Sequence, residues 1–445
     1  MSSVVSRLFY RFSKMMETKI MKVSGREPSD IISNLPHDVI KFILTCLPLR
    51  DAVRTSILSR KWRYNWTKVP KLTLDSRLWK KTKQNISTPR VKFAVILFQL
   101  LSLHQGPITE CGVSISDLKD CPEIDNLIFF LSRNGIEHLD FKFPKGEKYK
   151  LPSSVFTCSH MRHLTLKYCL INLPPAFEAF SRLLTLELYE VTISDKSLEN
   201  LISCCPKLEH VELEISVPLN SIEVNAPQIR YFYFGTKINS VCFKNTPLLD
   251  YVYIVMQDIN NGSVERGKCN FMEFFGSLPA LKDLNLDYFI IKTLIAGIDE
   301  IPVRLPMLLL CLRQLYLCEI RISELNDIRC LFCLIRSSPY LEKIGMEAFN
   351  DKGDELPVLE YLEAEYHSDM KLNQLTKVCL KEISGTKPEM ELIKLLLAKS
   401  LKLETMLIEP CIEPESPQTL VEILKQINEF QRASPRTKVK FIDEV

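Results

Sequence analysis

The chain has 445 residues, which is too long for one compact core and predicts either two or three domains or one long repeat array. Its formal net charge of +3 excludes nucleic-acid binding driven by global charge, and its 13 glycines argue against phosphate-cradling loops. Hydrophobic residues make up 46% and charged residues 25%, which is ordinary for a folded globular protein.

Residues 1–27 predict a disordered leader. Basic side chains outnumber acids there, at Arg7, Arg11, Lys14, Lys19 and Lys22, with Arg26 close to its end. An organelle transit peptide is the alternative, but no strongly amphipathic helix extends through the segment. Along the whole chain no apolar stretch approaches the ~20 residues of a membrane helix, so we expect no membrane partner.

Residues 28–70 predict a module of three short helices. Pro36 can open the first helix, and apolar side chains from Val39 to Leu47 then recur at helical spacing until Pro48 ends it. A second helix is expected over 49–57, and Ser59 is a plausible N-cap for a third. Three helices of this size make a marginal core, so the rest of the chain or a partner must cover some apolar side chains.

This module resembles the F-box. The resemblance is carried by Leu35-Pro36, Ile43-Leu44, Leu47-Pro48, Ala52-Val53, Thr55-Ser56, Leu58-Ser59, Trp62-Arg63 and Trp66. Cys46 stands where many relatives have serine. In that family the module docks on a Skp-type adaptor, which bridges to a cullin, a RING protein and a ubiquitin-conjugating enzyme. The resemblance implies a docking surface formed or supported by Leu35, Pro36, Ile40, Leu44, Leu47, Pro48, Val53, Leu58 and Trp62.

A charged connector is expected over 71–105, and a repeat array over 106–370. The pattern apolar-x-x-apolar-x-apolar recurs in twelve copies that start at Ile136, Met161, Leu183, Leu208, Ile229, Leu249, Leu281, Leu312, Leu341, Leu359, Leu375 and Leu403. Most spacings between copies lie in or near the ~20–29 residues of leucine-rich repeats. Six copies have a proline two residues upstream, at Pro206, Pro227, Pro247, Pro279, Pro339 and Pro357, where it would end the preceding element.

The predicted fold class is α/β: a three-helix F-box, then a leucine-rich-repeat solenoid with parallel strands on its concave side. One unit cannot bury its own apolar side, so stacked neighbours share a continuous core. If the fourth and sixth positions of a copy point inward, the third, fifth and seventh point out of the concave sheet.

Those outward positions predict an aromatic and acidic concave face. They hold Tyr189, Tyr231, Tyr233, Tyr251, Tyr253, Tyr316 and Tyr361, with Glu187, Glu212, Glu214, Asp283 and Asp287 in the middle repeats and Glu363 and Glu365 further on. Tyrosine is enriched in binding surfaces, so we expect the face to bind a basic segment of a protein substrate. The alternative is that tyrosine merely suits a strand and the acids are solvated.

Residues 371–445 resemble the FBD region that follows the repeats in a large plant family of F-box proteins. The resemblance is carried by Gly385, Glu389, Leu392, Leu396-Leu397, Leu403, Met406, Ile408 and Arg432-Ala433-Ser434-Pro435. The segment predicts a strand, a turn at Gly385, a helix, a second strand, a short helix from about 418 to 430 and a last strand. We expect it to cap the open end of the solenoid.

The sequence predicts no catalytic residue, no metal and no cofactor. Cys330 and Cys333 form a CxxC without a second pair at zinc spacing, and core packing explains them better. The 15 cysteines are odd in number and irregularly spaced, which indicates reduced thiols in a protein of the cytoplasm, the nucleus or both.

The expected function is that of a non-catalytic substrate-recognition subunit of an SCF-type (Skp/cullin/F-box) ubiquitin ligase. Two alternatives stay open at this point. One is a protein-binding scaffold that works without the ligase. The other is a small-molecule receptor, which would need a closed pocket with convergent polar groups.

Overall fold

The structure, a computed structural model, divides into two compact units, Met1–Met161 and Arg162–Val445, here called unit 1 and unit 2. It describes residues 35–78, 88–115, 118, 121–146, 148–255, 270–296, 298, 300–349, 353–411, 423 and 425–442. The predicted leader over 1–27 lies outside these residues. Of the helix expected from about 418 to 430, residues 423 and 425–429 are helical, and 418–422 and 424 lie outside the described residues.

The F-box-like module of unit 1 begins with α2 (His37–Thr45) and α3 (Leu49–Arg54), each preceded by a proline. Two 3₁₀ turns follow, η1 (Thr55–Ile57) and η2 (Asn65–Lys68). The prediction of a third α-helix starting at Ser59 is therefore wrong. The chain turns instead, with the Trp62 N–H donating to the Ser59 carbonyl at 3.1 Å, and both Trp62 and Trp66 are buried. Burial of the two indoles thus outweighs local helix propensity.

The solenoid begins earlier than predicted. Strands β1 (Lys71–Leu74), β2 (Glu110–Ser114) and β3 (His138–Lys142) pair in parallel in that order. The segment 71–105, predicted to be a connector, therefore supplies the first strand and a return helix, α4 (Pro89–Leu103). Val69, Leu72 and Leu74 already have the repeat spacing and are buried. The remaining elements of unit 1 are η3 (Ser76–Leu78), α5 (Glu123–Ser132), β4 (Tyr149–Lys150) and η4 (Ser153–Thr157).

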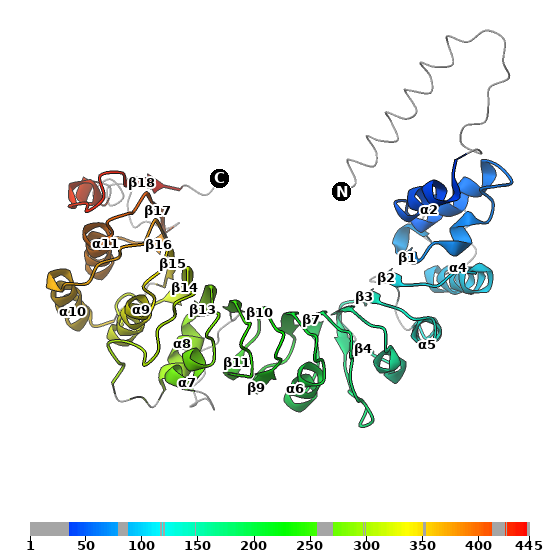
Figure 1. The fold of residues 1–445 in the computed structure, drawn as a ribbon, viewed down its shortest axis with the longest axis horizontal. Coiled ribbons are helices and arrows are strands. Elements are labelled where there is room, and N and C mark those ends of the chain that lie inside the picture. Colours follow the sequence, from blue (N-terminus) through cyan, green and yellow to red (C-terminus); the bar gives the residue numbers. More distant parts are fainter. Residues whose placement is uncertain are drawn as a thin grey trace, which may run out of the picture. The chain divides into compact units, whose positions relative to one another are not determined.

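Unit 2 is a curved solenoid of parallel strands, as predicted. Its sheet has the order β5 (His163–Lys167), β7 (Thr185–Val191), β8 (His210–Ile215), β10 (Tyr231–Phe234), β12 (Tyr251–Ile254), β13 (Asp283–Asp287), β14 (Gln314–Ile320), β15 (Lys343–Ala348), β16 (Lys377–Ile383), β17 (Thr405–Pro410) and β18 (Lys438–Phe441). These strands line the inner side of the unit, and the outer side carries α6 (Asp195–Ser203), α7 (Phe271–Gly276), α9 (Leu325–Ser337), α10 (Glu355–His367) and α11 (Lys387–Lys399) (Figure 1). Unit 2 also contains β6 (Cys169–Leu170) and α8 (Tyr288–Ile295).

The prolines upstream of the strands act in turns rather than as helix terminators. At Pro206, for example, the Leu208 N–H donates to the Cys205 carbonyl at 3.1 Å, so the proline occupies the second position of the turn. Proline suits that position because its φ is already close to the required value. The same hydrogen bond closes the turns at Pro227, Pro247, Pro279 and Pro339.

Two short repeats replace the outer helix with a strand. The copies that start at Leu208 and Ile229 are followed by β9 (Leu219–Asn225) and β11 (Ile238–Lys244), which pair in parallel. The next copies begin only 21 and 20 residues later, and an extended return segment needs fewer residues than a helix with its two connections. This accounts for the uneven outer side that the irregular spacing predicted.

The prediction of a repeat strand is wrong for one of the twelve copies. The residues that start at Leu359 belong to α10, so Tyr361, Glu363 and Glu365 are helical and do not lie on the concave sheet. Leucines three residues apart fit a helix as well as this strand pattern. Asp354 caps the helix, accepting from the Leu356 N–H at 3.3 Å. The other eleven copies each coincide with a strand, and the Leu375 copy directly follows the Leu341 copy in the sheet.

The FBD-like region continues the same sheet. Strand β16 pairs with β17, and β17 pairs with β18, all in parallel. Gly385 follows β16 with φ +82°, a left-handed backbone conformation that favours glycine. A Cβ there would lie 2.3 Å from Ile423 Cδ1, so the isoleucine side chain would have to move. Helix α11 begins with a capping box between Thr386 and Glu389.

The structure also bears on the expectations for the CxxC cysteines and for membrane-spanning helices. Cys330 and Cys333 lie side by side in the core face of α9, both buried, which matches the prediction of packing. In the part of the chain that the structure describes, no helix is both long and apolar enough to span a bilayer.

Candidate protein-interaction surfaces

The F-box-like module presents exposed apolar side chains in unit 1. Phe42 is 70% exposed and Ile57 is 87% exposed, and Val39, Val53 and Leu58 are also exposed. Here these five side chains are called the F-box face. Large apolar groups that remain in contact with water are typical of a surface that a partner covers. The described residues of the chain therefore leave this surface accessible.

The nine predicted docking residues divide into two groups. Ile40, Leu44 and Trp62 are at most 2% exposed, so they support the module from inside and cannot touch a partner directly. The other six are half-buried or exposed: Leu35, Pro36, Leu47, Pro48, Val53 and Leu58. Sequence reasoning included neither Phe42 nor Ile57. The position of Phe42 opposite Ile40 and Leu44 on α2 was available as a signal, whereas Ile57 lies in η1. The docking role of all these residues stays a prediction.

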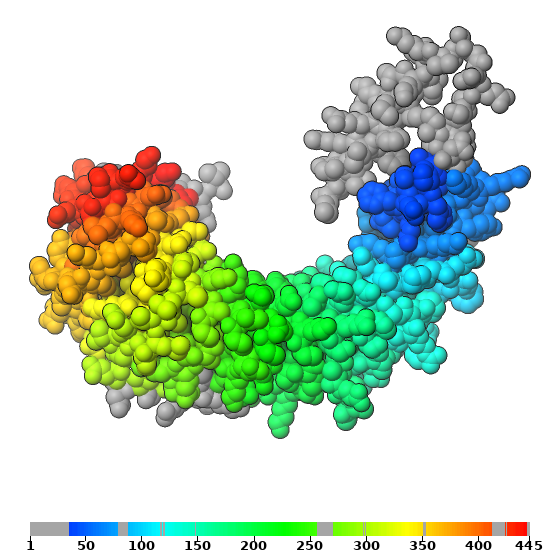
Figure 2. Space-filling view, viewed as in Figure 1, coloured from blue at the N-terminus to red at the C-terminus, as the bar shows by residue number. Residues whose placement is uncertain are grey.

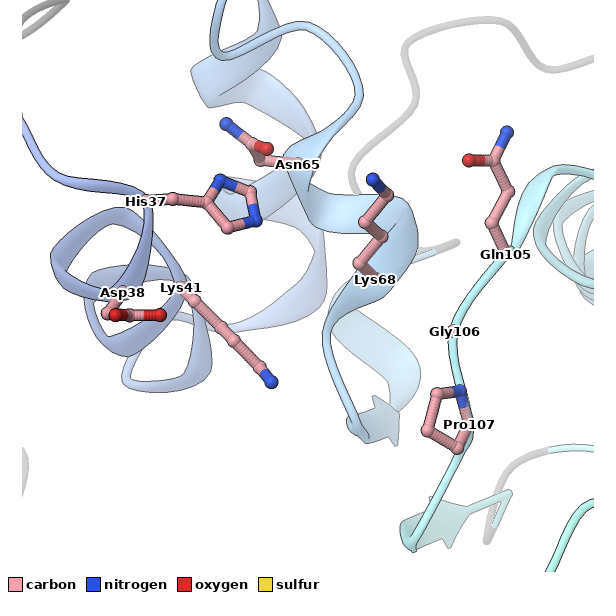
Figure 3. A pocket seen from close by; sticks show the side chains of 8 residues that line it. All are labelled: His37, Asp38, Lys41, Asn65, Lys68, Gln105, Gly106 and Pro107. Atoms are coloured by element: carbon pink, nitrogen blue, oxygen red, sulfur yellow. The ribbon is translucent and has the colours of Figure 1, made fainter.

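A polar pocket of about 250 Å³ lies beside the module in unit 1. His37, Asp38 and Lys41 of α2, Asn65 and Lys68 of η2 and Gln105–Pro107 line it (Figure 3). The N–H groups of Gln105 and Gly106 donate to the Thr67 carbonyl at 2.9 and 3.3 Å, which fastens the first repeat to the module. No member of the F-box face lines this pocket, so the apolar surface and the polar pocket are separate features.

The predicted concave residues of the middle repeats come together on four adjacent strands of unit 2. The set comprises Glu187, Tyr189, Glu212, Glu214, Tyr231, Tyr233, Tyr251 and Tyr253, here called the acidic–tyrosine surface. The register aligns Glu187 with Glu212, Glu212 with Tyr233, and Tyr233 with Tyr253. All eight side chains are half-buried or exposed. They belong to the strands that line the inner side of unit 2, which Figure 2 shows hollowed between green and red.

Tyrosines hold the carboxylates of this surface in place. The Tyr189 hydroxyl donates to Glu212 Oε2, and the His210 Nε2 lies 2.9 Å from Glu212 Oε1. Tyr233 also interacts electrostatically with Glu214, and Tyr253 with Asp283. The His210 and Tyr231 rings stack with centroids 4.3 Å apart. Glu212 is therefore held by neighbouring side chains, and its orientation is set before any partner arrives.

The electrostatics of the surface favour a cation. The pKa of Glu214 is raised by partial burial and by the neighbouring charges of Glu190 and Glu212. Burial and the charge of Asp283 raise the pKa of Tyr253 to about 12, so this side chain keeps its proton as a donor. A lysine or arginine bound beside Glu214 would favour the ionised carboxylate, which burial and the neighbouring acids disfavour.

One intramolecular contact already shows this chemistry. Lys167 of β5 places its Nζ 4.1 Å from the centroid of the Tyr189 ring, a cation–π geometry. Sequence reasoning missed Lys167 because it considered only the later repeats, although the same position rule applies to the copy at Met161.

Two predicted substrate-binding residues lie elsewhere. Asp287 is only 1% exposed and caps α8, accepting from the Phe289 N–H at 2.8 Å, so its proposed role on the concave surface is wrong. A capping aspartate at the end of a strand satisfies a helix N–H that would otherwise be buried. Tyr316 does lie on β14, two strands beyond β12 in the sheet. Its ring covers Gly345, where a Cβ would come within 2.0 Å of Tyr316 Cδ2.

A second pocket, of about 420 Å³, lies between the end of α9 and neighbouring loops of unit 2. Its lining includes Arg304, Arg336, Asp369, Lys371 and Asn373. Arg336 is engaged by Glu365, whose Oε1 lies 2.6 Å from the Arg336 guanidinium. Neither pocket is lined by the concave tyrosines. Among the described residues, no group of three or more His, Cys, Asp or Glu side chains could hold a metal ion.

Comparison with known proteins matches both parts of the chain. Residues 32–74 match the model of the F-box domain, and residues 124–346 match the model of the leucine-rich repeats of the FBD-associated F-box protein At5g56370. The F-box/FBD/LRR-repeat protein At1g13570 of Arabidopsis thaliana is 31% identical over 431 residues, which cover 94% of this chain and 100% of that protein. The F-box/FBD/LRR-repeat protein At5g56420 of the same plant is 29% identical over 58% of this chain and 65% of its own length.

A solved structure is also similar. The LRR protein LIC12759 of Leptospira interrogans shares 16% sequence identity, with 88% of this chain and 98% of that chain covered and a TM-score of 0.34.

Proposed function

Because this chain belongs to the F-box/FBD/LRR-repeat protein family, we propose that it is the substrate-recognition subunit of an SCF-type E3 ubiquitin ligase. Its F-box implies binding to a Skp-type adaptor, and its repeats make it a protein-interaction molecule. The observation that carries the proposal is the F-box face, whose apolar side chains remain exposed in unit 1. Through the adaptor, the subunit would join a cullin and a RING protein.

In this role the chain would contribute proximity rather than chemistry. Holding a substrate lysine close to a charged ubiquitin-conjugating enzyme replaces a bimolecular encounter with an effectively intramolecular one. No catalytic side chain and no cofactor of its own is needed for that. We expect the protein in the cytoplasm, the nucleus or both, where buried free thiols remain reduced.

The acidic–tyrosine surface is the proposed substrate site, and its ligand would be a basic protein segment. Preoriented carboxylates and amphipathic rings suit lysine and arginine side chains, which can lay their stems on tyrosine while the charge meets an acid. The contact of Lys167 with Tyr189 supports this reading, since it is the same interaction within one chain.

The proposal is tested by affinity purification from plant cells treated with a proteasome inhibitor. The wild type should co-purify the Skp-type adaptor, the cullin and substrate proteins. The variant Leu35→Ala/Pro36→Ala should lose the adaptor and the cullin while it keeps the substrates. If the wild type brings the adaptor down without the cullin, the chain is a ligase-independent scaffold, and the proposal fails.

Reversing charge on the acidic–tyrosine surface should remove substrate capture. In Glu212→Lys/Glu214→Lys, two lysines replace the preoriented acids and repel a basic segment, so recovery of substrates should fall at least tenfold. Binding of the adaptor should be unchanged. The matched control is Glu360→Lys/Glu363→Lys, which makes the same charge change at exposed positions of α10. Equal capture by the two variants would show that substrates bind elsewhere.

A further inference from the structure

The charge of the outward-pointing side chains on the concave sheet of unit 2 changes from negative to positive along the solenoid. The outward positions of β7, β8 and β13 hold Glu187, Glu212, Glu214 and Asp283, and none of them holds lysine or arginine. The equivalent positions of β15, β16 and β18 hold Lys343, Lys377, Lys438 and Lys440, here called the lysine row. The register places these lysines on the same lines across the sheet as the acids: Asp283 pairs with Gln314, Gln314 with Lys343, and Lys343 with Lys377.

The lysine row keeps its charge available. All four side chains are exposed, and among the described residues none of them forms an ion pair. Lys343 donates to the Gln314 amide oxygen at 3.3 Å. Lys381 of β16 behaves differently, because its Nζ lies 3.3 Å from Glu409 Oε2. The outward positions of β15 to β18 thus contain the Lys381–Glu409 pair, the acid Glu347 and four lysines that form no ion pair with any described carboxylate, although the charge of Lys343 acts on Asp283 from a distance.

Between Glu212 and the lysine row lie three tyrosines on β12 and β14, with the buried Asp283 on the strand between them. Tyr251 and Tyr253 occupy β12, and Tyr316 of β14 covers Gly345. The sheet order puts six steps between β8 and β16, which at ~4.8 Å a step is roughly 29 Å, or about nine residues of extended chain. One extended segment can therefore reach both charged regions.

We propose that the lysine row binds an acidic protein segment, so that the partner of unit 2 carries a basic stretch and an acidic stretch about nine residues apart. This inference rests on the proposed function, because it extends the substrate site from its acidic half to a basic half. The separate acidic and basic regions of unit 2 would then select a partner whose basic and acidic stretches are also separate. It would also fix the direction in which the segment lies, since the reverse placement puts like charges together.

The composition of the row favours carboxylates over phosphates. It contains lysine and no arginine, whereas arginine is the side chain whose fork matches a phosphate with two hydrogen bonds. Glu347 and Glu409 lie among the lysines, which lowers the local positive potential that a nucleic acid would need. An acidic peptide of moderate charge is the ligand that these positions fit.

The test uses the full-length protein and three labelled peptides, measured by fluorescence anisotropy at low and physiological salt. The first peptide has a block of four lysines, nine neutral residues including tyrosine, and a block of four glutamates. The second has serines in place of the glutamates, and the third has serines in place of the lysines. The wild type should bind the two-block peptide about tenfold more tightly than the lysine-only peptide, with an advantage that shrinks at higher salt.

The variant Lys343→Glu/Lys377→Glu/Lys438→Glu should lose that advantage and still bind the lysine-only peptide. Its matched control is Lys196→Glu/Lys371→Glu/Lys387→Glu, exposed lysines of the same unit away from the concave strands, which should keep the advantage. Equal binding of the two-block and lysine-only peptides to the wild type would overturn the inference and leave the proposed function intact. Tighter binding of an RNA oligonucleotide than of the glutamate-only peptide would overturn it as well. Failure of the proposed function is read separately, from loss of the cullin in the purification described above.

Discussion

Replacing Phe42 and Ile57 of the F-box face by aspartate is expected to abolish co-purification of the Skp-type adaptor. Both side chains are largely exposed in unit 1, so the substitutions remove apolar contact area without opening a cavity in the module. Each would contribute about 1.5–3 kcal/mol if a partner buried it fully. Losing both corresponds to an affinity roughly 10² to 10⁴ times weaker, and two aspartates facing an apolar partner surface add a desolvation cost.

The control for this experiment is Phe98→Asp. Phe98 lies on α4 of the same unit and is 73% exposed, close to the 70% of Phe42, but it is outside the F-box-like module. This variant should bind the adaptor like the wild type, as measured by calorimetry with purified adaptor. Circular dichroism should show unchanged melting for both variants. If Phe42→Asp/Ile57→Asp keeps wild-type affinity while it remains folded, the adaptor does not dock on the F-box face.

A buried carboxyl in unit 2 makes stability depend on pH near neutrality. Asp327 lies in the first turn of α9 and is 4% exposed. Burial raises its pKa from 3.8 to about 7, against the hydrogen bond from the Arg321 N–H at 3.3 Å, which favours the ionised form. The folded state therefore binds the proton more tightly than the unfolded state. Stability is fully present below the unfolded pKa and is lost as pH rises through about 7, by up to about 4 kcal/mol.

The variant Asp327→Asn is expected to remove this dependence. Asparagine keeps an oxygen that can accept from the Arg321 N–H and carries no charge to bury. The difference in free energy of unfolding between variant and wild type should grow from pH 4 to pH 8, to the order of several kcal/mol in favour of the variant. Hydrogen exchange of the α9 amides measures it locally. The control Asp354→Asn conserves an exposed helix cap on α10 and should show no such growth. Parallel pH profiles for Asp327→Asn and the wild type would contradict the assignment.

Repeat spacing made most of the solenoid predictable. Apolar side chains at the first, fourth and sixth positions of a repeat are buried against the repeats before and after it. The pattern therefore marks a strand wherever the chain has a repeat on both sides. The strand at Leu72 obeys the same rule and was missed only because the charged residues after it suggested a connector. Strand β18 could not be found this way, because polar Arg436 stands at the first position of its unit.

The sequence predicted which side chains point out of the concave sheet, but it did not predict which side chains they contact. Alternation along a strand decides that Glu212 and Tyr233 point away from the core, and the same rule applied to β15 and β16 identifies Lys343 and Lys377. Which neighbour each side chain meets depends on the register between strands far apart in sequence. That register joined Tyr189 to Glu212 and Lys167 to Tyr189.

By itself the sequence determined the F-box-like module, the parallel solenoid and the face on which the tyrosines and acids lie, because burial periodicity is a local property of the chain. Tertiary structure alone decided that the Leu359 copy is helical, that Asp287 caps α8 and is buried, and that Ile57 stays exposed. Each of these outcomes depends on which neighbours cover a side chain. Distant segments supply those neighbours, and no local pattern specifies them.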